Sequence, residues 1–319
     1  MNTSELSLDL IVQSKQQIAN GIFEFDLRHP DGHPLPAFSA GAHLSVKTPI
    51  GLVNKYSLSN NPLQHDRYVI AVKREERGRG GSLSMADELM QGSILPVSLP
   101  NNVFELVPDR PEYIFIAGGI GITPIYSMIQ SLYHQNIERF KLYYLTRDAP
   151  STAYMEALAQ SPFRDQVIIH HDEGDPERSF DLWPVLEKPA HRQIYCCGPR
   201  HLMEAVKDMT GHWSRDAVTF ESFGTDAALS RTNVPFEVRL QRSDKIIQVS
   251  EQSTLLEALR ESGVQVSSSC ESGTCGSCRT GLISGDVEHR DMVLEDHELQ
   301  DNIMVCVSRA RGGTLVLDL

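Results

Sequence analysis

The spacing of apolar positions is different in successive parts of the chain. Over the first hundred residues, short runs that alternate apolar and polar residues are separated by Gly, Pro and Asn, as at 41–47 and 68–72. Alternation with a period of two indicates strands with one buried face, and short strands between turn residues are typical of an antiparallel barrel or sandwich. The segment 84–90, after Gly80 and Gly81, predicts a helix in this region.

From residue 112 the apolar runs become continuous and alternate with helical patterns. Buried strands that alternate with helices predict a parallel sheet wound by right-handed crossovers. From residue 236 the chain starts like a hairpin, continues with a helix predicted over 255–262 and reaches a cysteine-rich loop. The apolar runs are 113–117, 140–145, 167–170 and 193–197, and the first helical pattern covers 124–135.

These changes of pattern divide the 319 residues into three domains. We expect a β domain over 1–107, an α/β domain over 108–224 and a small cysteine-rich domain over 236–319. The segment 225–235 is small and polar and ends in Pro235, which is the composition of a linker.

Charge and targeting signals narrow the class of protein. The chain has 29 Lys and Arg against 42 Asp and Glu, a net charge of −13, which argues against binding to a nucleic acid backbone. Its first ten residues contain no basic residue and no apolar stretch of signal-peptide length, and the most apolar segment, 113–129, is broken by glycine and proline. We therefore expect a cytoplasmic protein, where six cysteines favour metal or redox chemistry over disulfides.

Four cysteines have the spacing of an iron-sulfur site. Cys270, Cys275 and Cys278 form C-x4-C-x2-C, and Cys306 follows after 27 further residues. Four thiolates can hold two tetrahedral irons, and this spacing is the plant-type 2Fe-2S pattern. A zinc ribbon is the alternative, although it usually pairs two C-x2-C knuckles.

Two glycine turns follow predicted strands of the α/β domain. The turn with Gly118, Gly119 and Gly121 opens a helix, where free backbone amides can approach a pyrophosphate. A second turn, 197–199, ends a later strand of the same predicted sheet, so both loops should meet at its carboxyl edge. Tight packing is the alternative explanation for each turn. We assign Cys196 a structural role and leave that of Cys197 open.

The β domain contains candidate flavin contacts. Tyr56 can line a flat ring, and the Ser57 hydroxyl can donate to a ring nitrogen. The glycine turn at 79–84 suits a phosphate, and it follows the most basic stretch of the chain, with Lys73, Arg74, Arg77 and Arg79. A strand that merely packs and a solvated charged loop are the alternatives here.

Taken together, the chain resembles the phthalate dioxygenase reductase family of the ferredoxin–NADP reductase superfamily. The resemblance covers the whole chain and is carried by Tyr-Ser-Leu at 56–58, Gly-Arg-Gly-Gly-Ser at 78–82, Ala-Gly-Gly-Ile-Gly-Ile-Thr-Pro at 117–124, Tyr-Tyr-Leu-Thr-Arg-Asp at 143–148, Tyr-Cys-Cys-Gly-Pro at 195–199 and Glu-Ser-Phe-Gly at 221–224. It implies an antiparallel flavin-binding β-barrel, a parallel-sheet nicotinamide-binding α/β domain and a C-terminal β-grasp 2Fe-2S ferredoxin domain.

The resemblance also implies a function and a set of sites. Electrons would pass from NADH through FMN and the 2Fe-2S cluster to a Rieske-type aromatic-ring oxygenase. Ser57, Thr123, Cys197 and Phe223 would lie where the nicotinamide meets the flavin. The implied cofactor-binding residues are Tyr56, Ser57, Lys73, Gly80, Gly81, Ser82, Gly118, Gly119, Gly121, Thr123, Thr146, Arg147, Cys197, Gly198, Pro199 and Phe223.

The sequence departs from the family at one position of this set. Asn54 stands where the family usually has Arg, so we expect Lys55 or Arg79 to supply the charge near the flavin. Asp148 directly follows Arg147, which favours NADH over NADPH.

The partner is less defined by the sequence. An O-demethylase or an amine-oxidising Rieske enzyme could be the acceptor, and a zinc-binding, non-catalytic nucleotide module is the alternative of another class. Seven acidic residues between 284 and 301, against one Arg290, suggest either a docking face or a solvated surface.

Overall fold

The computed structural model describes residues 6–76, 78–189, 191–223 and 233–319. It divides into two compact units, Met1–Glu221 and Ser222–Leu319, and each is described by itself. Most of the linker predicted at 225–235 lies outside the described residues, as does Arg77. Among the described residues, none of the helices has both the length and the apolar composition that crossing a bilayer requires.

The first six strands form an antiparallel barrel, as the alternating pattern predicts. Their order in the sheet is β4-β3-β6-β1-β2-β5. A bridge between Leu58 and Ile70, and a bond of 2.8 Å from Ser59 N to Val69 O, join the chain after β4 to β5 and close the barrel. The strands are β1 Leu6–Ala19, β2 Ile22–Arg28, β3 His43–Lys47, β4 Val53–Ser57, β5 Tyr68–Lys73 and β6 Ile94–Ser98.

The helix of this region begins earlier than the sequence indicates. Helix α1 covers Gly81–Asp87, so the predicted range 84–90 is wrong at both ends. Gly80 adopts a φ of 91°, a left-handed conformation that lets the chain turn directly into the helix at Gly81.

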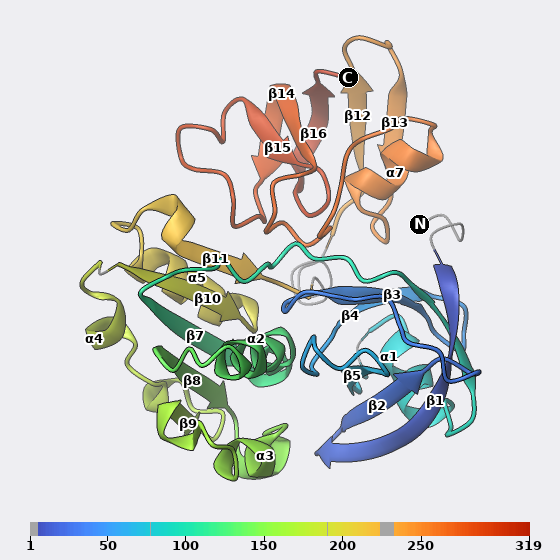
Figure 1. The fold of residues 1–319 in the computed structure, drawn as a ribbon. Coiled ribbons are helices and arrows are strands. Elements are labelled where there is room, and N and C mark those ends of the chain that lie inside the picture. Colours follow the sequence, from blue (N-terminus) through green and yellow to red (C-terminus); the bar gives the residue numbers. More distant parts are fainter. Residues whose placement is uncertain (1–5, 77, 190, 224–232) are drawn as a thin grey trace. The chain divides into compact units, whose positions relative to one another are not determined.

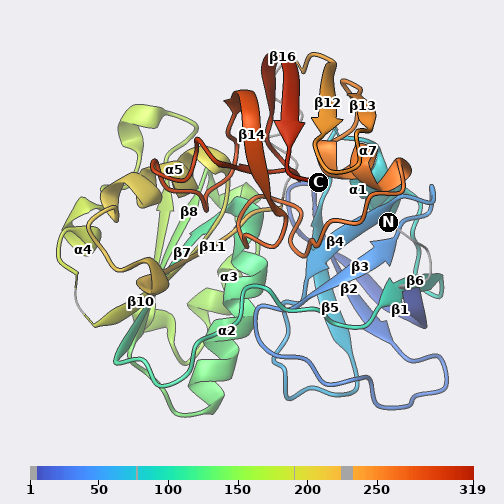
Figure 2. The ribbon, with the colours of Figure 1, turned by 90° about the horizontal axis from the view of Figure 1, so that it is seen from above.

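The second half of this unit is a parallel sheet, as predicted from its continuous apolar runs. The strand order is β11-β10-β7-β8-β9, and all neighbours are parallel. Helices α2 and α3 lie on one face and α4 and α5 on the other (Figure 2), as right-handed crossovers in opposite directions require. The elements are β7 Glu112–Gly118, α2 Ile122–His134, β8 Phe140–Thr146, α3 Met155–Ala159, β9 Val167–His171, α4 Trp183–Leu186, β10 Arg192–Cys197, α5 Arg200–Met209 and β11 Val218–Glu221.

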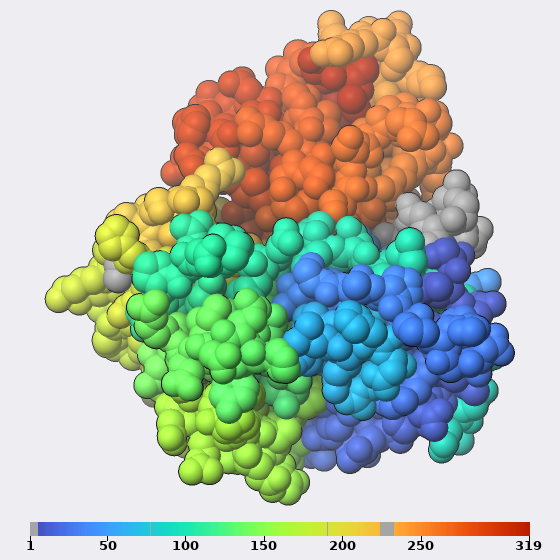
Figure 3. Space-filling view, viewed as in Figure 1, coloured from blue at the N-terminus to red at the C-terminus, as the bar shows by residue number. Residues whose placement is uncertain are grey.

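Helix α2 connects the sheet to the barrel within this unit. Ser127 Oγ donates to the Asn60 carbonyl at 2.8 Å, and Gln130 Nε2 donates to the Ser59 carbonyl at 2.8 Å. Tyr154 OH, from the segment before α3, donates to Ser59 Oγ at 2.9 Å. The barrel and the parallel-sheet part of this unit accordingly form one continuous surface in Figure 3.

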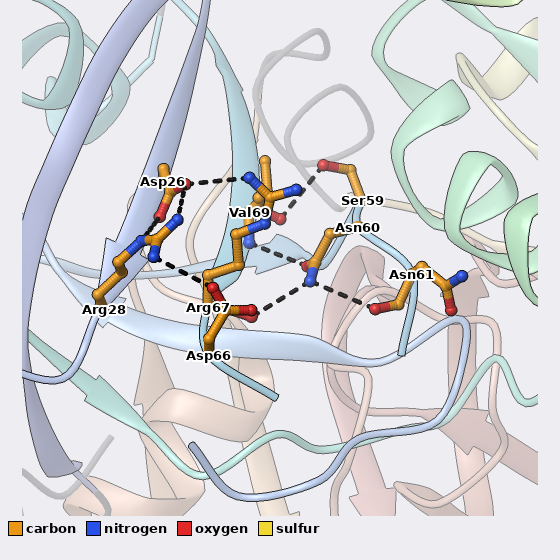
Figure 4. A network of polar contacts seen from close by, with 8 residues as sticks. All are labelled: Asp26, Arg28, Ser59, Asn60, Asn61, Asp66, Arg67 and Val69. Atoms are coloured by element: carbon orange, nitrogen blue, oxygen red, sulfur yellow. Dashed lines mark hydrogen bonds and ion pairs between the residues drawn. The ribbon is translucent and has the colours of Figure 1, made fainter. Parts of the chain in front are cut away.

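Asn60 fixes the segment after β4 on the barrel side (Figure 4). Its Oδ1 accepts from Val69 N at 3.0 Å, and its Nδ2 donates to the Arg67 carbonyl at 3.2 Å. Arg67 in turn contacts Asp26 of β2 at 3.2 Å. The residues that touch α2 are therefore part of the barrel wall.

Over the described residues 233–319, the second unit is a five-stranded mixed sheet against which helix α7 packs (Figure 1). The order is β13-β12-β16-β14-β15, with β12 and β16 parallel, which is a β-grasp arrangement. Thr254 and Glu257 form a capping box at the start of α7, and its apolar face is buried in the core. The elements are β12 Phe236–Leu240, β13 Ile246–Val249, α7 Leu255–Glu261, β14 Arg279–Glu288, β15 Asn302–Met304 and β16 Arg309–Leu317.

We predict that Tyr195→Phe destabilises the first unit. The buried Tyr195 hydroxyl accepts from Val107 N at 2.7 Å and donates to the Glu105 carbonyl at 3.0 Å, which fixes the connection between β6 and β7. Burial raises the pKa of Tyr195 to about 12, so the hydroxyl keeps its proton at neutral pH. Its loss should cost about 1–2 kcal/mol and lower the calorimetric Tm by about 2–6 °C. Tyr133→Phe, at a ring that is 38% exposed, is the control; equal Tm values for the two variants would contradict the role of Tyr195.

Candidate functional site

The predicted flavin contacts lie at the end of β4. Ser57 is buried and Tyr56 is half-buried. Asn54 Nδ2 donates to Tyr56 OH at 3.2 Å, and a Cβ atom on Gly81 would lie 2.5 Å from the same nitrogen. Burial raises the pKa of Tyr56, and the bond from Asn54 partly opposes this shift. Asn54, which departs from the family pattern, therefore lies between the tyrosine predicted to line the flavin ring and the predicted phosphate turn.

The predicted phosphate ligands have contacts within their own loop. Ser82 Oγ accepts from Glu75 N at 3.1 Å. Lys73 Nζ lies 3.3 Å from Glu75 Oε2, and both side chains are substantially exposed. The structure thus brings Lys73 and Ser82 together around Glu75.

The two glycine turns of the parallel sheet touch each other through their backbones. A Cβ on Gly121 would lie 2.1 Å from the Cys197 carbonyl oxygen, and one on Gly118 would lie 2.5 Å from Pro199 Cδ. A Cβ on Gly198 would approach Gly118 to 2.9 Å. Close packing, the alternative considered from the sequence, therefore explains the need for glycine at these three positions.

Gly119 differs from the other three glycines. It adopts a φ of 53°, and a Cβ placed there would meet no atom within 4 Å. Thr123, which is buried one turn later, donates from Oγ1 to the Ile120 carbonyl at 3.0 Å and steadies the start of α2. The open side of this turn is at Gly119, where a ligand can approach the backbone.

A buried carboxylate joins the end of β4 to the ends of β10 and β11. Glu221, the last residue of β11, is 6% exposed and pairs in register with Cys197 of β10. Ser57 Oγ donates to Glu221 Oε2 at 3.4 Å. Burial first, and the Glu221 charge second, raise the pKa of Cys197 well above its usual value, so the thiol stays neutral. The ends of β4, β10 and β11 therefore meet at one point.

Glu221 was not among the residues that the sequence analysis selected. It begins the Glu-Ser-Phe-Gly motif, from which only Phe223 was taken as a site residue. Its place at the start of that motif was the available signal, because the strand that it ends, β11, was not predicted from the sequence. Phe223 itself falls in the second unit, so its contact with the flavin stays a prediction. Cys196 is fully buried, which fits the structural role expected for it.

The segment expected to meet the adenosine side of the dinucleotide is partly internal. Thr146 Oγ1 is buried and lies 2.9 Å from His171 Nδ1 and 2.8 Å from Thr152 Oγ1. Arg147 is exposed and lies against Gly174. Asp148 accepts from Ser151 N at 2.8 Å, and its bonds with Ser151 lower its pKa. Of these predicted contacts, Arg147 is the one that presents its side chain outward.

The four cysteines of the second unit form two pairs. Cys270 N donates to Cys275 Sγ at 3.4 Å, and the Cys278 and Cys306 thiols lie close enough for each to shift the pKa of the other. Among the described residues, no three His, Cys, Asp or Glu side chains are placed to hold one metal ion together.

Two pairs of thiols fit a 2Fe-2S cluster, in which each iron takes two thiolates, better than a single tetrahedral zinc. Cys278 and Cys306 are each 2% exposed, while Cys270 and Cys275 are half-buried. Ser272 N donates to Cys270 Sγ at 3.4 Å, and Ser277 Oγ lies 2.9 Å from Cys275 Sγ. Polar groups therefore already surround the sulfurs that a cluster would use.

Comparison with known proteins agrees with these sites. The model of the oxidoreductase NAD-binding domain matches residues 115–208, and that of the 2Fe-2S iron-sulfur cluster binding domain matches residues 238–311. The chain is 54% identical to the phthalate 4,5-dioxygenase oxygenase reductase subunit of Pseudomonas putida, over 97% of this chain and 96% of that one. It is 51% identical to phthalate dioxygenase reductase of Burkholderia cepacia, over 98% and 97%. A solved structure of phthalate dioxygenase reductase, described as a modular structure for electron transfer from pyridine nucleotides to [2Fe-2S], covers all of both chains with 50% identity and a TM-score of 0.80.

The barrel, the nicotinamide sheet and the ferredoxin module together define a flavin-dependent, iron-sulfur NADH oxidoreductase. Within this class, the chain belongs to the phthalate dioxygenase reductase family. It carries electrons from NADH through FMN and a 2Fe-2S cluster to an oxygenase component, which rules out the zinc-binding, non-catalytic alternative.

The glycine contacts predict different effects for two substitutions. Gly121→Ala places a methyl group against the Cys197 carbonyl and should destabilise the first unit by about 2–3 kcal/mol. Gly119→Ala has space but a left-handed backbone, so its cost should be about 1 kcal/mol, while its methyl group should raise the KM for NADH several-fold. Urea unfolding and steady-state kinetics measure both effects. A larger loss of stability for Gly119→Ala would contradict the packing argument.

Proposed function

We propose that this chain is the reductase component of a Rieske-type oxygenase that attacks a carboxylated aromatic ring, as phthalate-type dioxygenases do. The observation that carries this proposal is the identity of 54% along almost the whole chain to a reductase subunit of such a system. An O-demethylase or an amine-oxidising enzyme is the competing acceptor. We place the system in the cytoplasm, where the cysteines stay reduced.

We assign the hydride-transfer site to the point where β4, β10 and β11 end. When bound there, FMN accepts a hydride and passes on electrons singly. The Ser57 hydroxyl donates to Glu221 in the structure, and with FMN bound we expect it to turn to a ring nitrogen, while the buried neutral Cys197 thiol keeps water from the site. Glu221 puts a negative charge beside them, where it stabilises the positive charge that a nicotinamide ring gains when its hydride leaves.

The remaining assignments follow the loops that carry them. Tyr56 lines the flavin ring, and Phe223 covers it. Lys73 and the Gly80–Gly81–Ser82 turn hold the flavin phosphate. NADH binds along Gly118, Gly119, Gly121, Thr123, Thr146, Arg147, Gly198 and Pro199, and the domains keep the limits 1–107, 108–224 and 236–319.

We propose that acidic residues of the ferredoxin unit dock on the oxygenase. Three of the seven acids between 284 and 301 are engaged internally: Glu288 pairs with Arg290, Asp291 caps the turn at Val293, and Glu298 pairs with Arg279. The docking patch consists of three exposed acids, Glu295, Asp296 and Asp301; Asp286 is exposed too but lies 3.5 Å from Arg311 Nε. It is smaller than the sequence suggests.

Replacing the charge of Glu221 should slow hydride transfer. We expect Glu221→Gln to keep its flavin and its fold but to reduce NADH oxidation with ferricyanide by about tenfold or more, because a preorganised charge is lost. Glu204→Gln, at an exposed ion pair on α5, is the matched control. The slowed step should also show a larger isotope effect with 4-deuterated NADH. An unchanged rate and isotope effect would remove Glu221 from the site.

The proposed partner and docking patch can be tested in one reconstituted system. With this reductase, a purified phthalate-type dioxygenase should turn over at least tenfold faster than the oxygenase component of a vanillate-type O-demethylase. Raising the salt from 10 to 150 mM shortens the Debye length from about 30 to about 8 Å, and should lower kcat/KM for the oxygenase several-fold.

Variants separate docking from electron transfer within the reductase. Neutralising Glu295, Asp296 and Asp301 together should lower kcat/KM for the oxygenase about threefold and remove most of its salt dependence. Neutralising Glu251 and Glu261, exposed acids elsewhere in the same unit, is the control. Equal turnover with both oxygenases would refute the partner, and an unaltered salt dependence in the triple variant would refute the patch.

A further inference from the structure

The residue after the first cluster cysteine has an unfavourable backbone conformation. Glu271 follows Cys270 directly and adopts a φ of 57°, in the left-handed region. Steric conflict between Cβ and the carbonyl oxygen makes this region about tenfold less populated for a residue other than glycine. Some contact outside the loop must therefore compensate if the loop is to keep this shape.

An arginine on helix α7 supplies that contact. Arg260, in the last turn of α7, donates from Nη2 to Glu271 Oε1 at 2.8 Å and also to Ser268 Oγ. Ser268 Oγ in turn donates to the same carboxylate oxygen at 2.9 Å. The Arg260 and Glu271 side chains are 33% and 22% exposed, so the pair is shielded from much of the solvent. One carboxylate oxygen is thus held by a guanidinium and a hydroxyl at once.

The helix that carries Arg260 is itself firmly placed. Its capping box fixes the first turn, with Glu257 N donating to Thr254 Oγ1 at 3.1 Å. Leu255 and Leu259 on its inner face are fully buried. Arg260 therefore extends from a fixed support to the loop, and the loop adapts to it.

The conformation of Glu271 determines where the next amide points. Ser272 N donates to Cys270 Sγ at 3.4 Å, across the left-handed residue. Hydrogen bonds to ligating sulfurs are among the factors that set the potential of an iron-sulfur cluster. Rotating Glu271 to an ordinary φ would turn this amide away from the sulfur.

We propose that Arg260 is a positioning residue for the 2Fe-2S cluster: by holding Glu271 in its left-handed conformation, it keeps the Ser272 amide on the Cys270 sulfur. Arg260 acts through the backbone of the loop and needs no contact with the cluster. Its positive charge could instead act directly on the cluster potential, and glycine at 271 distinguishes the two explanations. Glycine adopts a φ near 57° without strain, so with glycine there the loop no longer needs the arginine.

The test compares four full-length variants, each with flavin and cluster bound. Two are the single variants Arg260→Met and Glu271→Gly, and the third is their double variant. The fourth, Arg239→Met, is the matched control, because Arg239 pairs with Asp244 at 2.7 Å and Asp244 also has a positive φ, in the turn between β12 and β13. The measurements are the rate of iron release to a chelator and the cluster midpoint potential from a redox titration followed by electron paramagnetic resonance.

Arg260→Met should release iron about tenfold faster, and its cluster should be harder to reduce by about threefold in the equilibrium constant, roughly 30 mV at ~59 mV per tenfold. The double variant and Glu271→Gly should both lie within twofold of the unaltered protein, as should Arg239→Met.

An Arg260→Met protein that matches Arg239→Met in both measurements would overturn the proposal. So would a double variant that keeps the full defect of Arg260→Met, because the charge rather than the loop conformation would then be responsible. If Arg260→Met retains no cluster, iron content decides: a double variant with full iron supports the proposal, and one without iron refutes it.

Discussion

Hydride transfer requires the flavin-binding strand and the nicotinamide loops to be held in a fixed relation, since reacting atoms must come within about 3–3.5 Å of each other. In this chain the relation depends on the short segment that leaves β4. Ser57 bonds Glu221 at the end of β11, Ser59 bonds Tyr154 and Gln130, and Asn60 bonds Ser127. The same segment closes the barrel through Leu58 and Ile70. The segment that closes the barrel therefore also holds the parallel sheet in position.

A half-buried acid beside this junction makes the stability of the fold depend on pH. Burial raises the pKa of Glu24 on β2, and the neighbouring Tyr154 partly opposes the shift. A carboxyl whose pKa is higher in the folded state stabilises the fold fully below its unfolded value, and this contribution is lost as the pH rises through the folded value. Tyr154 also stacks on Tyr126, with ring centroids 4.7 Å apart. Tyr154 therefore contacts Ser59 of the barrel segment and Tyr126 of α2, beside the acid whose titration affects the fold.

How far the sequence predicts this protein depends on how local each feature is. Four of the five parallel strands follow from continuous apolar runs, and the C-x4-C-x2-C spacing indicates the cluster, because each pattern lies within one segment; the short strand β11 was not predicted. The start of α1 was missed because it depends on the left-handed Gly80. The sequence does not identify Glu221, because a single carboxylate can be recognised as part of the site only when the strand order places β11 beside β10. The acidic run was overestimated because Asp291 turns its carboxylate inward to cap a turn, which charge counting does not show.

Asn54 stands where the family usually has arginine, and its contacts suggest a structural role in place of the charge. Asn54 is neutral, yet it bonds the Tyr56 hydroxyl and lies against Gly81, so it links the ring-binding strand to the phosphate turn. The nearby basic residues are already paired, Lys73 with Glu75 and Arg74 with Glu76 and Asp87. A phosphate placed at this turn must compete with those carboxylates for positive charge. The backbone amides at the start of α1 add donors that do not depend on these charged side chains, which supports the phosphate site proposed at this turn.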